Sequence, residues 1–179
     1  MTSHRAGNGN AGKLIIAALL VATAWSTPTK AEPASTPTAP AQFVARCVGI
    51  ADGDTLRVLY VDGDTKTEIK IRLNGIDAPE KKQPFGEQSK QALSTLAFGK
   101  DLTVNATGRD YFGRLLAWLS VGSTPINATM VKDGFAWWYR KYAPDNGELA
   151  QAEADARANH RGLWIDAAPV APWEWRRKR

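Results

Sequence analysis

Apolar and polar residues alternate along three consecutive stretches in the first half of the chain. These stretches are 43–50, 55–61 and 65–75. A period of two residues places successive side chains on opposite faces of a β-strand. The pattern therefore predicts three half-buried strands. In the third, Arg72 lies on the face opposite Ile71 and Leu73.

The period changes to that of a helix at residue 85, and strands and helices alternate from there on. The predicted helices are 85–99, 126–134 and 146–162, and the further strands are 101–107 and 114–121. Each helix stretch ends on a glycine, a common helix terminator. The order βββαββαα with about three helices fits a five-stranded OB-fold barrel, a β-rich α+β fold. Such barrels often present one face to oligonucleotides, but a fold alone does not determine function.

The first 31 residues have a different pattern from the rest of the chain. They contain no acidic residue, and Arg5 and Lys13 precede an apolar run of twelve residues at 14–25. This order is typical of a secretory signal, and the run is short for a membrane span. We therefore expect cleavage near Ala31 and a secreted or periplasmic protein without a membrane span after cleavage. Retention of residues 14–25 as a membrane anchor is the alternative.

Composition divides the remainder of the chain into three parts. Residues 32–42 are rich in Pro, Ala and Thr, which predicts an extended linker. Residues 43–166 carry the predicted strands and helices and are expected to form one domain. Residues 167–179 form a basic tail that contains tryptophan. Such a tail could bind nucleic acid or an anionic surface, or could simply be solvated.

Charge and cysteine content add little to this assignment. The formal net charge is +5, but three of the 23 basic residues lie in the predicted signal, which leaves 20 against 18 acidic residues. The basic excess therefore gives only weak support for a nucleic-acid partner. Cys47 is the only cysteine, so no intrachain disulfide can form. Its place in a predicted strand favours a buried, apolar role.

The tetrapeptide DGDT occurs twice, at 52–55 and at 62–65. If the predicted strands on either side of the second copy pair as an antiparallel hairpin, that copy is the hairpin tip. The first copy then lies at the opposite end, beside the exit of the third strand. At about 3.3 Å per residue, the two ends are about 25 to 30 Å apart. Asp54 can therefore share a metal ion with Asp77, whereas Asp64 cannot.

The exit of the third strand, IRLNGIDAPE, carries further acidic residues. Its glycine ends the strand and Pro79 prevents the strand from resuming, so the segment leaves the sheet in an extended conformation. Asp77, Glu80 and the carbonyl group of Ala78 are then presented at a rim near Asp54. Oxygen ligands without histidine or cysteine select a hard cation. The mixture of carboxylate, backbone carbonyl and water favours Ca²⁺ over Mg²⁺.

Two arginines could complete a site for a phosphoryl group. Arg72 belongs to the third strand, and Arg114 follows the tight turn DYFG directly. A guanidinium group can bind a phosphate through two parallel hydrogen bonds. Either arginine alone is more simply interpreted as a solvated strand residue. Together with the acidic rim, the pair indicates a site for a phosphodiester.

The motifs DGDT, IRLNGIDAPE and DYFGR, in this order on a βββαββαα chain, resemble the thermonuclease (staphylococcal-nuclease-like) family. The similarity covers about 44–164 and includes GFAWWYRKYAP and HRGLW in its later part. It implies an OB-fold and a Ca²⁺-dependent phosphodiesterase that cleaves DNA and RNA and leaves a 3′-phosphate. A non-catalytic OB-fold module that binds nucleic acid is the alternative. Its expected sign, loss of the acids or arginines, is absent.

The resemblance also implies a role for each site residue. The implied calcium ligands are Asp54, Asp77 and the carbonyl of Ala78. The implied general base is Glu80, and the implied phosphate-binding residues are Arg72 and Arg114. Phe112 and Tyr142 are the aromatic residues that would contact the nucleotide. We expect DNA and RNA as substrates, no obligate protein partner, and a monomer.

Overall fold

The computed structural model describes residues 41–178. The predicted signal peptide, 1–31, and residues 32–40 of the predicted linker lie outside the described residues. Within the described part, none of the helices combines the length and the apolar composition that a membrane crossing requires.

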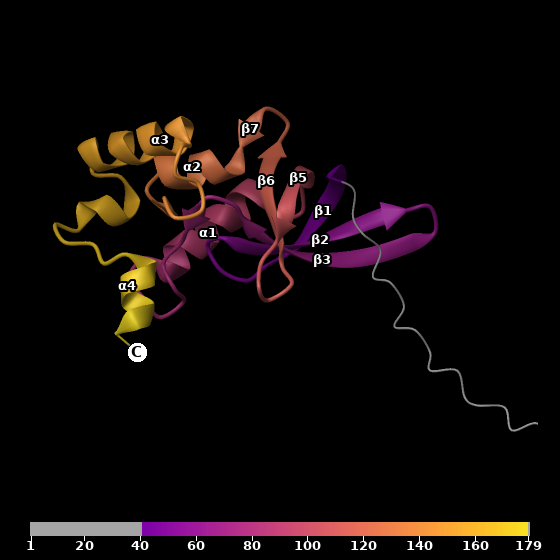
Figure 1. Ribbon diagram of the computed structural model, residues 1–179, viewed down its shortest axis with the longest axis horizontal. Helices are drawn as coiled ribbons and strands as arrows, with labels where there is room; N and C mark the ends of the chain where they lie inside the picture. The colour runs from indigo at the N-terminus through magenta and orange to yellow at the C-terminus, as the bar shows by residue number, and fades with distance from the viewer. Residues whose placement is uncertain (1–40, 179) are drawn as a thin grey trace, which may run out of the picture. The chain divides into compact units, whose positions relative to one another are not determined.

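Five main strands form a closed barrel (Figure 1). They are β1 Gln42–Ile50, β2 Thr55–Asp62, β3 Thr65–Leu73, β5 Asp101–Arg109 and β6 Leu115–Val121. The antiparallel order is β3-β2-β1-β5-β6, and a parallel pairing of β6 with β3 closes the barrel. The predicted OB-type barrel is therefore confirmed. Burial alternates strictly along β1, and Cys47 is buried there, as its position predicted.

The three predicted helices are present but end earlier than expected. They are α1 Gly86–Ala97, α2 Ile126–Lys132 and α3 Gly147–Ala158. The glycines that we placed in the last turn, Gly99, Gly134 and Gly162, all have positive φ and lie beyond the helices. A left-handed residue terminates an α-helix and is therefore not part of it. Helix α3 ends four residues before Gly162, because His160 already has a φ of 49°.

Three strands of two residues each were not predicted: β4 Ile76–Asp77, β7 Thr124–Pro125 and β8 Trp137–Trp138. Strand β3 ends at Leu73 and not at residue 75, because the chain turns at Gly75, whose φ is 73°. It then continues as β4, in which Asp77 pairs with Trp137 of β8. This short pairing fixes the backbone of Asp77 against a segment 60 residues away in sequence.

The end of the chain is more ordered than its composition suggested. A 3₁₀ helix, η1 Gly162–Ile165, precedes a fourth α-helix, α4 Pro172–Arg177, so the described residues hold four α-helices where about three were expected. Six residues are too few for a helix that is stable alone, so packing must stabilise α4. Its Trp173 stacks on Tyr139 with ring centroids 5.2 Å apart. In Figure 1, α4 is the yellow helix near the C-terminus.

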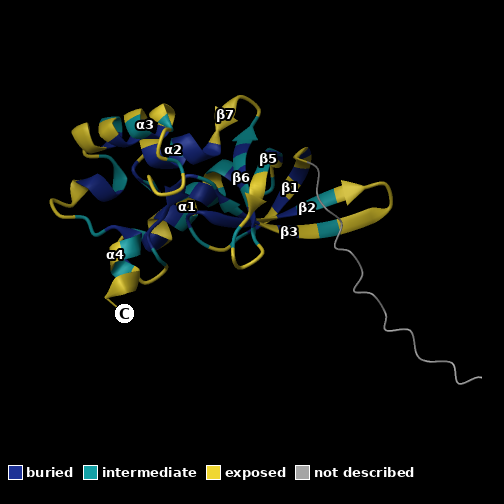
Figure 2. Ribbon diagram, viewed as in Figure 1, coloured by how far each residue is buried: buried dark blue, intermediate teal, exposed yellow. Residues whose placement is uncertain are grey.

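Burial divides the β2–β3 hairpin into two halves (Figure 2). In the half that belongs to the barrel wall, buried and more exposed residues alternate, and Leu56 and Ile71 are fully inaccessible to solvent. The far half projects into solvent, and residues 61–66 are all exposed. The two ends of one hairpin therefore lie in very different environments.

Candidate active site

The first DGDT forms a tight loop directly before β2. The Oδ1 atom of Asp52 accepts a hydrogen bond from the backbone N–H of Asp54 at 3.1 Å, which closes an Asx turn. The carbonyl of Asp54 accepts from the N–H of Leu73 at 2.8 Å. The loop is thereby attached to the exit of β3, where the sequence predicted that it would lie.

The carboxylate of Asp54 is buried, with 6% exposure, and fully engaged. Its Oδ1 atom accepts a hydrogen bond from Oγ1 of Thr55 at 3.0 Å. Its Oδ2 atom accepts from the backbone N–H of Ala78 at 2.7 Å. These bonds fix Asp54 against the segment that carries Asp77 and Ala78.

Gly53 allows the loop to approach helix α1 closely. A Cβ atom at this position would lie 1.9 Å from Oγ of Ser89 and 2.8 Å from Cβ of Ala78. Neither atom can move easily, because Ser89 is fully buried and donates to the carbonyl of Phe135 at 2.6 Å. Only glycine fits at residue 53.

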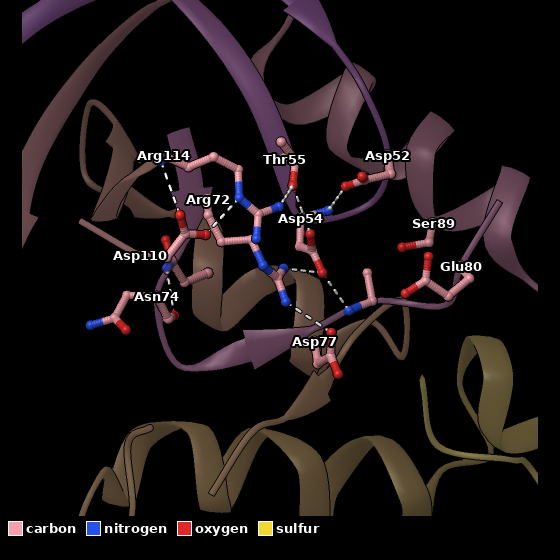
Figure 3. Close-up of polar contacts among 12 residues, drawn as sticks. Asp52, Asp54, Thr55, Arg72, Asn74, Asp77, Glu80, Ser89, Asp110 and Arg114 are labelled. Atoms are coloured by element: carbon pink, nitrogen blue, oxygen red, sulfur yellow. Dashed lines mark hydrogen bonds and ion pairs between the residues drawn. The ribbon is translucent and has the colours of Figure 1, made fainter. Parts of the chain in front are cut away.

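Arg72 lies between the two predicted metal-binding aspartates (Figure 3). Its Nη2 atom is 2.8 Å from Oδ1 of Asp77, and its Nη1 atom forms an ion pair with Oδ2 of Asp54. The Asp77 side chain is almost completely buried. Burial lowers the pKa of Arg72, an effect that the negative charge of Asp77 opposes and the positive charge of Arg114 reinforces.

Arg114 is held by Asp110, a residue that we did not assign to the site. The Oδ2 atom of Asp110 accepts from Nε of Arg114 at 2.6 Å, and its Oδ1 atom accepts the N–H groups of Phe112 and Arg114. Burial acts to raise the pKa of Asp110, but the hydrogen bonds from Arg114 outweigh it and lower this pKa. An aspartate at the first position of a tight turn is a typical turn signal, and it could have identified this role.

One cavity of about 570 Å³ joins these elements. All eight predicted site residues line it: Asp54, Arg72, Asp77, Ala78, Glu80, Phe112, Arg114 and Tyr142. The rings of Phe112 and Tyr142 are 79% and 60% exposed, so their surfaces are open to a ligand. Asp64 is not part of the cavity. The pairing of Asp62 with Thr65 makes Gly63 and Asp64 the two turn residues at the exposed hairpin tip, as predicted.

Arg176 of helix α4 also lines this cavity. We did not assign Arg176 to the site, because its one signal in the sequence was a cluster of basic residues. Its Nη2 atom is 2.7 Å from Oδ2 of Asp77, and its Nη1 atom is 2.7 Å from Oε1 of Glu80. Hydrogen bonding to Asp77 raises the pKa of Arg176, although partial burial opposes this. The acidic rim therefore contacts two arginines, Arg72 and Arg176.

The donor set can be compared with the needs of a divalent cation. Among residues 41–178, no three His, Cys, Asp or Glu side chains are grouped so that they could hold a metal ion. The candidate ligands are instead two carboxylates, Asp54 and Asp77, and the carbonyl of Ala78. Both carboxylates are buried. They hold the guanidinium of Arg72 between them, and Asp77 also binds that of Arg176. Such a pair fits a hard cation with oxygen and water ligands.

Comparisons with known proteins agree with this geometry. A family described as staphylococcal nuclease homologue matches residues 70–166, more than half of the chain. A protein of Haemophilus influenzae named as an uncharacterized endonuclease is 44% identical over 133 residues, which are 74% of this chain and 72% of that protein. The micrococcal nuclease of Shigella flexneri is 37% identical over 147 residues, which are 76% and 82% of the two chains.

A further relative, an uncharacterized endonuclease of Escherichia coli O157:H7, is 40% identical over 140 residues, which are 78% of this chain and 88% of the relative. The family match at 70–166 includes Arg72, Glu80 and Arg114. The chain therefore belongs to the staphylococcal nuclease family.

Proposed function

We propose that this nuclease is a Ca²⁺-dependent endonuclease that hydrolyses phosphodiester bonds in DNA and RNA and leaves 3′-phosphate products. One observation carries the proposal: two buried carboxylates, two arginines and a more exposed glutamate converge on a single cavity. The names of the relatives, endonuclease and micrococcal nuclease, support the same reaction class.

The metal would be held by Asp54, Asp77 and the carbonyl of Ala78. When bound, Ca²⁺ supplies a Lewis acid that polarises a phosphoryl oxygen. Burial of both carboxylates favours this role, because buried carboxylates require positive charge beside them. The Thr55 and Ala78 hydrogen bonds keep Asp54 oriented toward the cavity.

Arg72 and Arg114 would bind the scissile phosphate and stabilise the negative charge that accumulates on its oxygens in the transition state. Asp110 supports this role, because it fixes the Nε side of Arg114, whose Nη1 atom donates to Oγ1 of Thr55 at 3.4 Å beside the cavity. Lysine at either position would lose the planar, two-pronged geometry.

Glu80 would act as the general base that takes a proton from the attacking water. Its side chain is 41% exposed, whereas those of Asp54 and Asp77 are nearly inaccessible. Water therefore reaches the Glu80 carboxylate more easily than the two aspartate carboxylates. A base within hydrogen-bond reach of the water accelerates hydrolysis by about 10²- to 10⁴-fold.

Phe112 and Tyr142 would contact the nucleotide. The guanidinium carbon of Arg114 lies 5.7 Å from the ring centroid of Phe112, so a base stacked on Phe112 would be next to a phosphate bound by Arg114. Stacking is tolerant of base identity, because every base has a π-face. This supports cleavage of both DNA and RNA.

We further propose that the enzyme acts as a monomer in the extracellular space or the periplasm. The charge order of residues 1–31 supports export, and it predicts removal of these residues near Ala31. The mass of the exported protein tests this, because a retained anchor would leave the full-length mass.

The decisive assay for the function incubates purified protein with single- and double-stranded DNA and RNA in Ca²⁺, in Mg²⁺ and in chelator. We expect cleavage with Ca²⁺, little with Mg²⁺ and none in chelator, and 3′-phosphate ends on the products. Full cleavage in chelator would contradict the metal assignment.

Glu80→Gln tests the base. We expect the cleavage rate to fall by about 10²- to 10⁴-fold with substrate binding largely retained. Glu68→Gln is the matched control, since Glu68 lies on β3 toward the hairpin tip and, within residues 41–178, has one ion pair, an exposed one with Arg57. An unchanged rate for Glu80→Gln would remove Glu80 from this role.

A further inference from the structure

Helix α4 brings a second arginine, Arg176, to the acidic rim, from a position 99 residues after Asp77. Two nitrogens of Arg176 face the two oxygens of Asp77, with Nη2–Oδ2 at 2.7 Å and Nη1–Oδ1 at 3.3 Å. The Nη1 atom also donates to Oε1 of Glu80 at 2.7 Å. One guanidinium group thus bridges a candidate metal ligand and the candidate base.

The Glu80 carboxylate depends on this contact for its orientation. Within residues 41–178, its one ion pair is with Arg176, whereas Asp77 also contacts Arg72. A half-exposed glutamate without a partner samples several rotamers, and a charged hydrogen bond selects among them. Arg176 therefore limits where the Glu80 carboxylate can lie relative to Asp77.

Helix α4 is anchored, and it does not rest loosely on the cavity. The ring of Trp173 stacks on Tyr139 at an interplanar angle of 4°. It also forms an edge-to-face pair with Trp137, with ring centroids 5.6 Å apart. Ala171 and Pro172 are buried. An element that had to leave the site in each reaction cycle would have to break these apolar contacts.

Gln83 connects the anchor of α4 to the loop that carries Glu80. Its side-chain oxygen accepts the backbone N–H of Glu80 at 3.1 Å, and its side-chain nitrogen donates to the carbonyl of Val170 at 2.6 Å. Gln83 is itself buried, at 7% exposure. One side chain therefore ties the backbone of the candidate base to the segment that leads into α4.

We infer that Arg176 is a positioning residue of the nuclease site, which holds the Glu80 carboxylate at a fixed place relative to Asp77. The inference rests on the proposed function, in which Glu80 is the general base. It makes the C-terminal segment part of the active site, because the anchored helix keeps Arg176 in place.

The test compares Arg176→Ala with Arg177→Ala in the full protein. Arg177 is the adjacent residue, its side chain is 74% exposed, and its one ion pair among the described residues is with Glu174 at 3.9 Å. For Arg176→Ala we expect kcat to fall by about 10- to 100-fold and KM to stay nearly unchanged. Misplacement of a reacting group by about 1 Å slows a reaction by a factor of this size. Arg177→Ala should stay within about twofold of wild type.

Three readouts separate positioning of Glu80 from a loss of general structure. Added guanidinium ion should restore part of the activity of Arg176→Ala, but none of the activity of Glu80→Gln. In the Glu80→Gln background, Arg176→Ala should cost little further, since both changes remove the same contribution. Calorimetric titration should show that Arg176→Ala binds Ca²⁺ at least as tightly as wild type, because a cation beside Asp77 is gone.

Circular dichroism and the melting temperature establish that the variant is folded. If Arg176→Ala does not fold, Arg176→Lys is tested in its place. Lysine keeps the positive charge but cannot bridge Asp77 and Glu80 as the guanidinium does, so kcat should fall several-fold. An unchanged kcat for the folded variant overturns the inference. A faster reaction would instead identify α4 as an inhibitory plug. Failure of the proposed function is distinct, because wild type would then cleave in chelator or Glu80→Gln would remain active.

Discussion

The two DGDT tetrapeptides have the same sequence and opposite surroundings. In the first copy Gly53, Asp54 and Thr55 are buried, whereas all four residues of the second copy are exposed. Both form turns, as Asp-Gly sequences generally do. The local sequence therefore determines the turn, and partners distant in sequence determine whether an aspartate in that turn can do chemistry.

Strand register creates the difference. The β2–β3 pairing matches Thr55 with Arg72 at one end of the hairpin and Asp62 with Thr65 at the other. This places Asp54 beside Arg72 and the N–H of Ala78, 24 residues further along the chain. A register shift of one residue would turn Arg72 into the core and remove this match.

The largest expected difference is in catalysis by the two aspartate variants. Asp54→Ala removes a proposed metal ligand, and loss of even an outer-shell partner costs about 10- to 100-fold, so we expect at least about a 100-fold fall in cleavage rate. Asp64→Ala should cleave at the wild-type rate and lose at most about 1 kcal/mol of unfolding free energy. Cleavage rates on one oligonucleotide and urea unfolding check both statements.

Substitution of the glycine in each DGDT copy by alanine should destabilise the protein for a different physical reason and to a different extent. In Gly53→Ala the new methyl group would collide with buried Ser89 and with Ala78, so we expect a loss of about 1 to 3 kcal/mol in stability and reduced activity. Gly63 has open space around its Cβ position but a φ of 56°, so Gly63→Ala should cost only about 1 to 2 kcal/mol of backbone strain. Normal activity of a folded Gly53→Ala would contradict the close approach described here.

Asp110, a third aspartate in a tight turn, tests whether forming the turn is enough for catalysis or whether the charge of the aspartate is also needed. Asp110→Asn keeps a side chain that can form the turn but loses the charge that binds Nε of Arg114. We expect cleavage to slow by about 10-fold, because an outer contact of a phosphate-binding group is weakened. A wild-type rate would show that Arg114 is positioned without Asp110.

The smallest expected effect is the contribution of Asp110 to the stability of the folded protein at acidic pH. The pKa of Asp110 lies below its ordinary value of 3.8 in the folded protein. A lowered carboxyl pKa contributes stability that is complete above the unfolded pKa and is lost as the pH falls through the folded value. The stability advantage of wild type over Asp110→Asn should therefore be constant above about pH 5 and shrink below about pH 4 in denaturant titrations.

Sequence patterns predicted the barrel, the β2–β3 hairpin and the approach of Asp54 to the exit of β3, because strand alternation and turn residues are local signals. The nucleotide-contacting residues Phe112 and Tyr142 came instead from the resemblance to the family. The contribution of Asp110 was missed although its turn was recognised, since the contact with Arg114 depends on side-chain direction. Helix α4 was missed for a different reason. Its six residues are too few for a periodic apolar pattern, although Pro172 at the start and Arg176 and Arg177 in the last turn are typical of helix ends. Trp173 and Arg176 acquire their partners only when the chain has folded.

A calorimetric Ca²⁺ titration of wild type, Asp54→Ala and Asp64→Ala separates the two copies without relying on turnover. We predict wild-type affinity for Asp64→Ala and an affinity lower by at least about 100-fold for Asp54→Ala, because only Asp54 faces Asp77 across Arg72. Undiminished Ca²⁺ binding by Asp54→Ala, or weakened binding by a folded Asp64→Ala, would contradict the assignment of the metal site to the first DGDT.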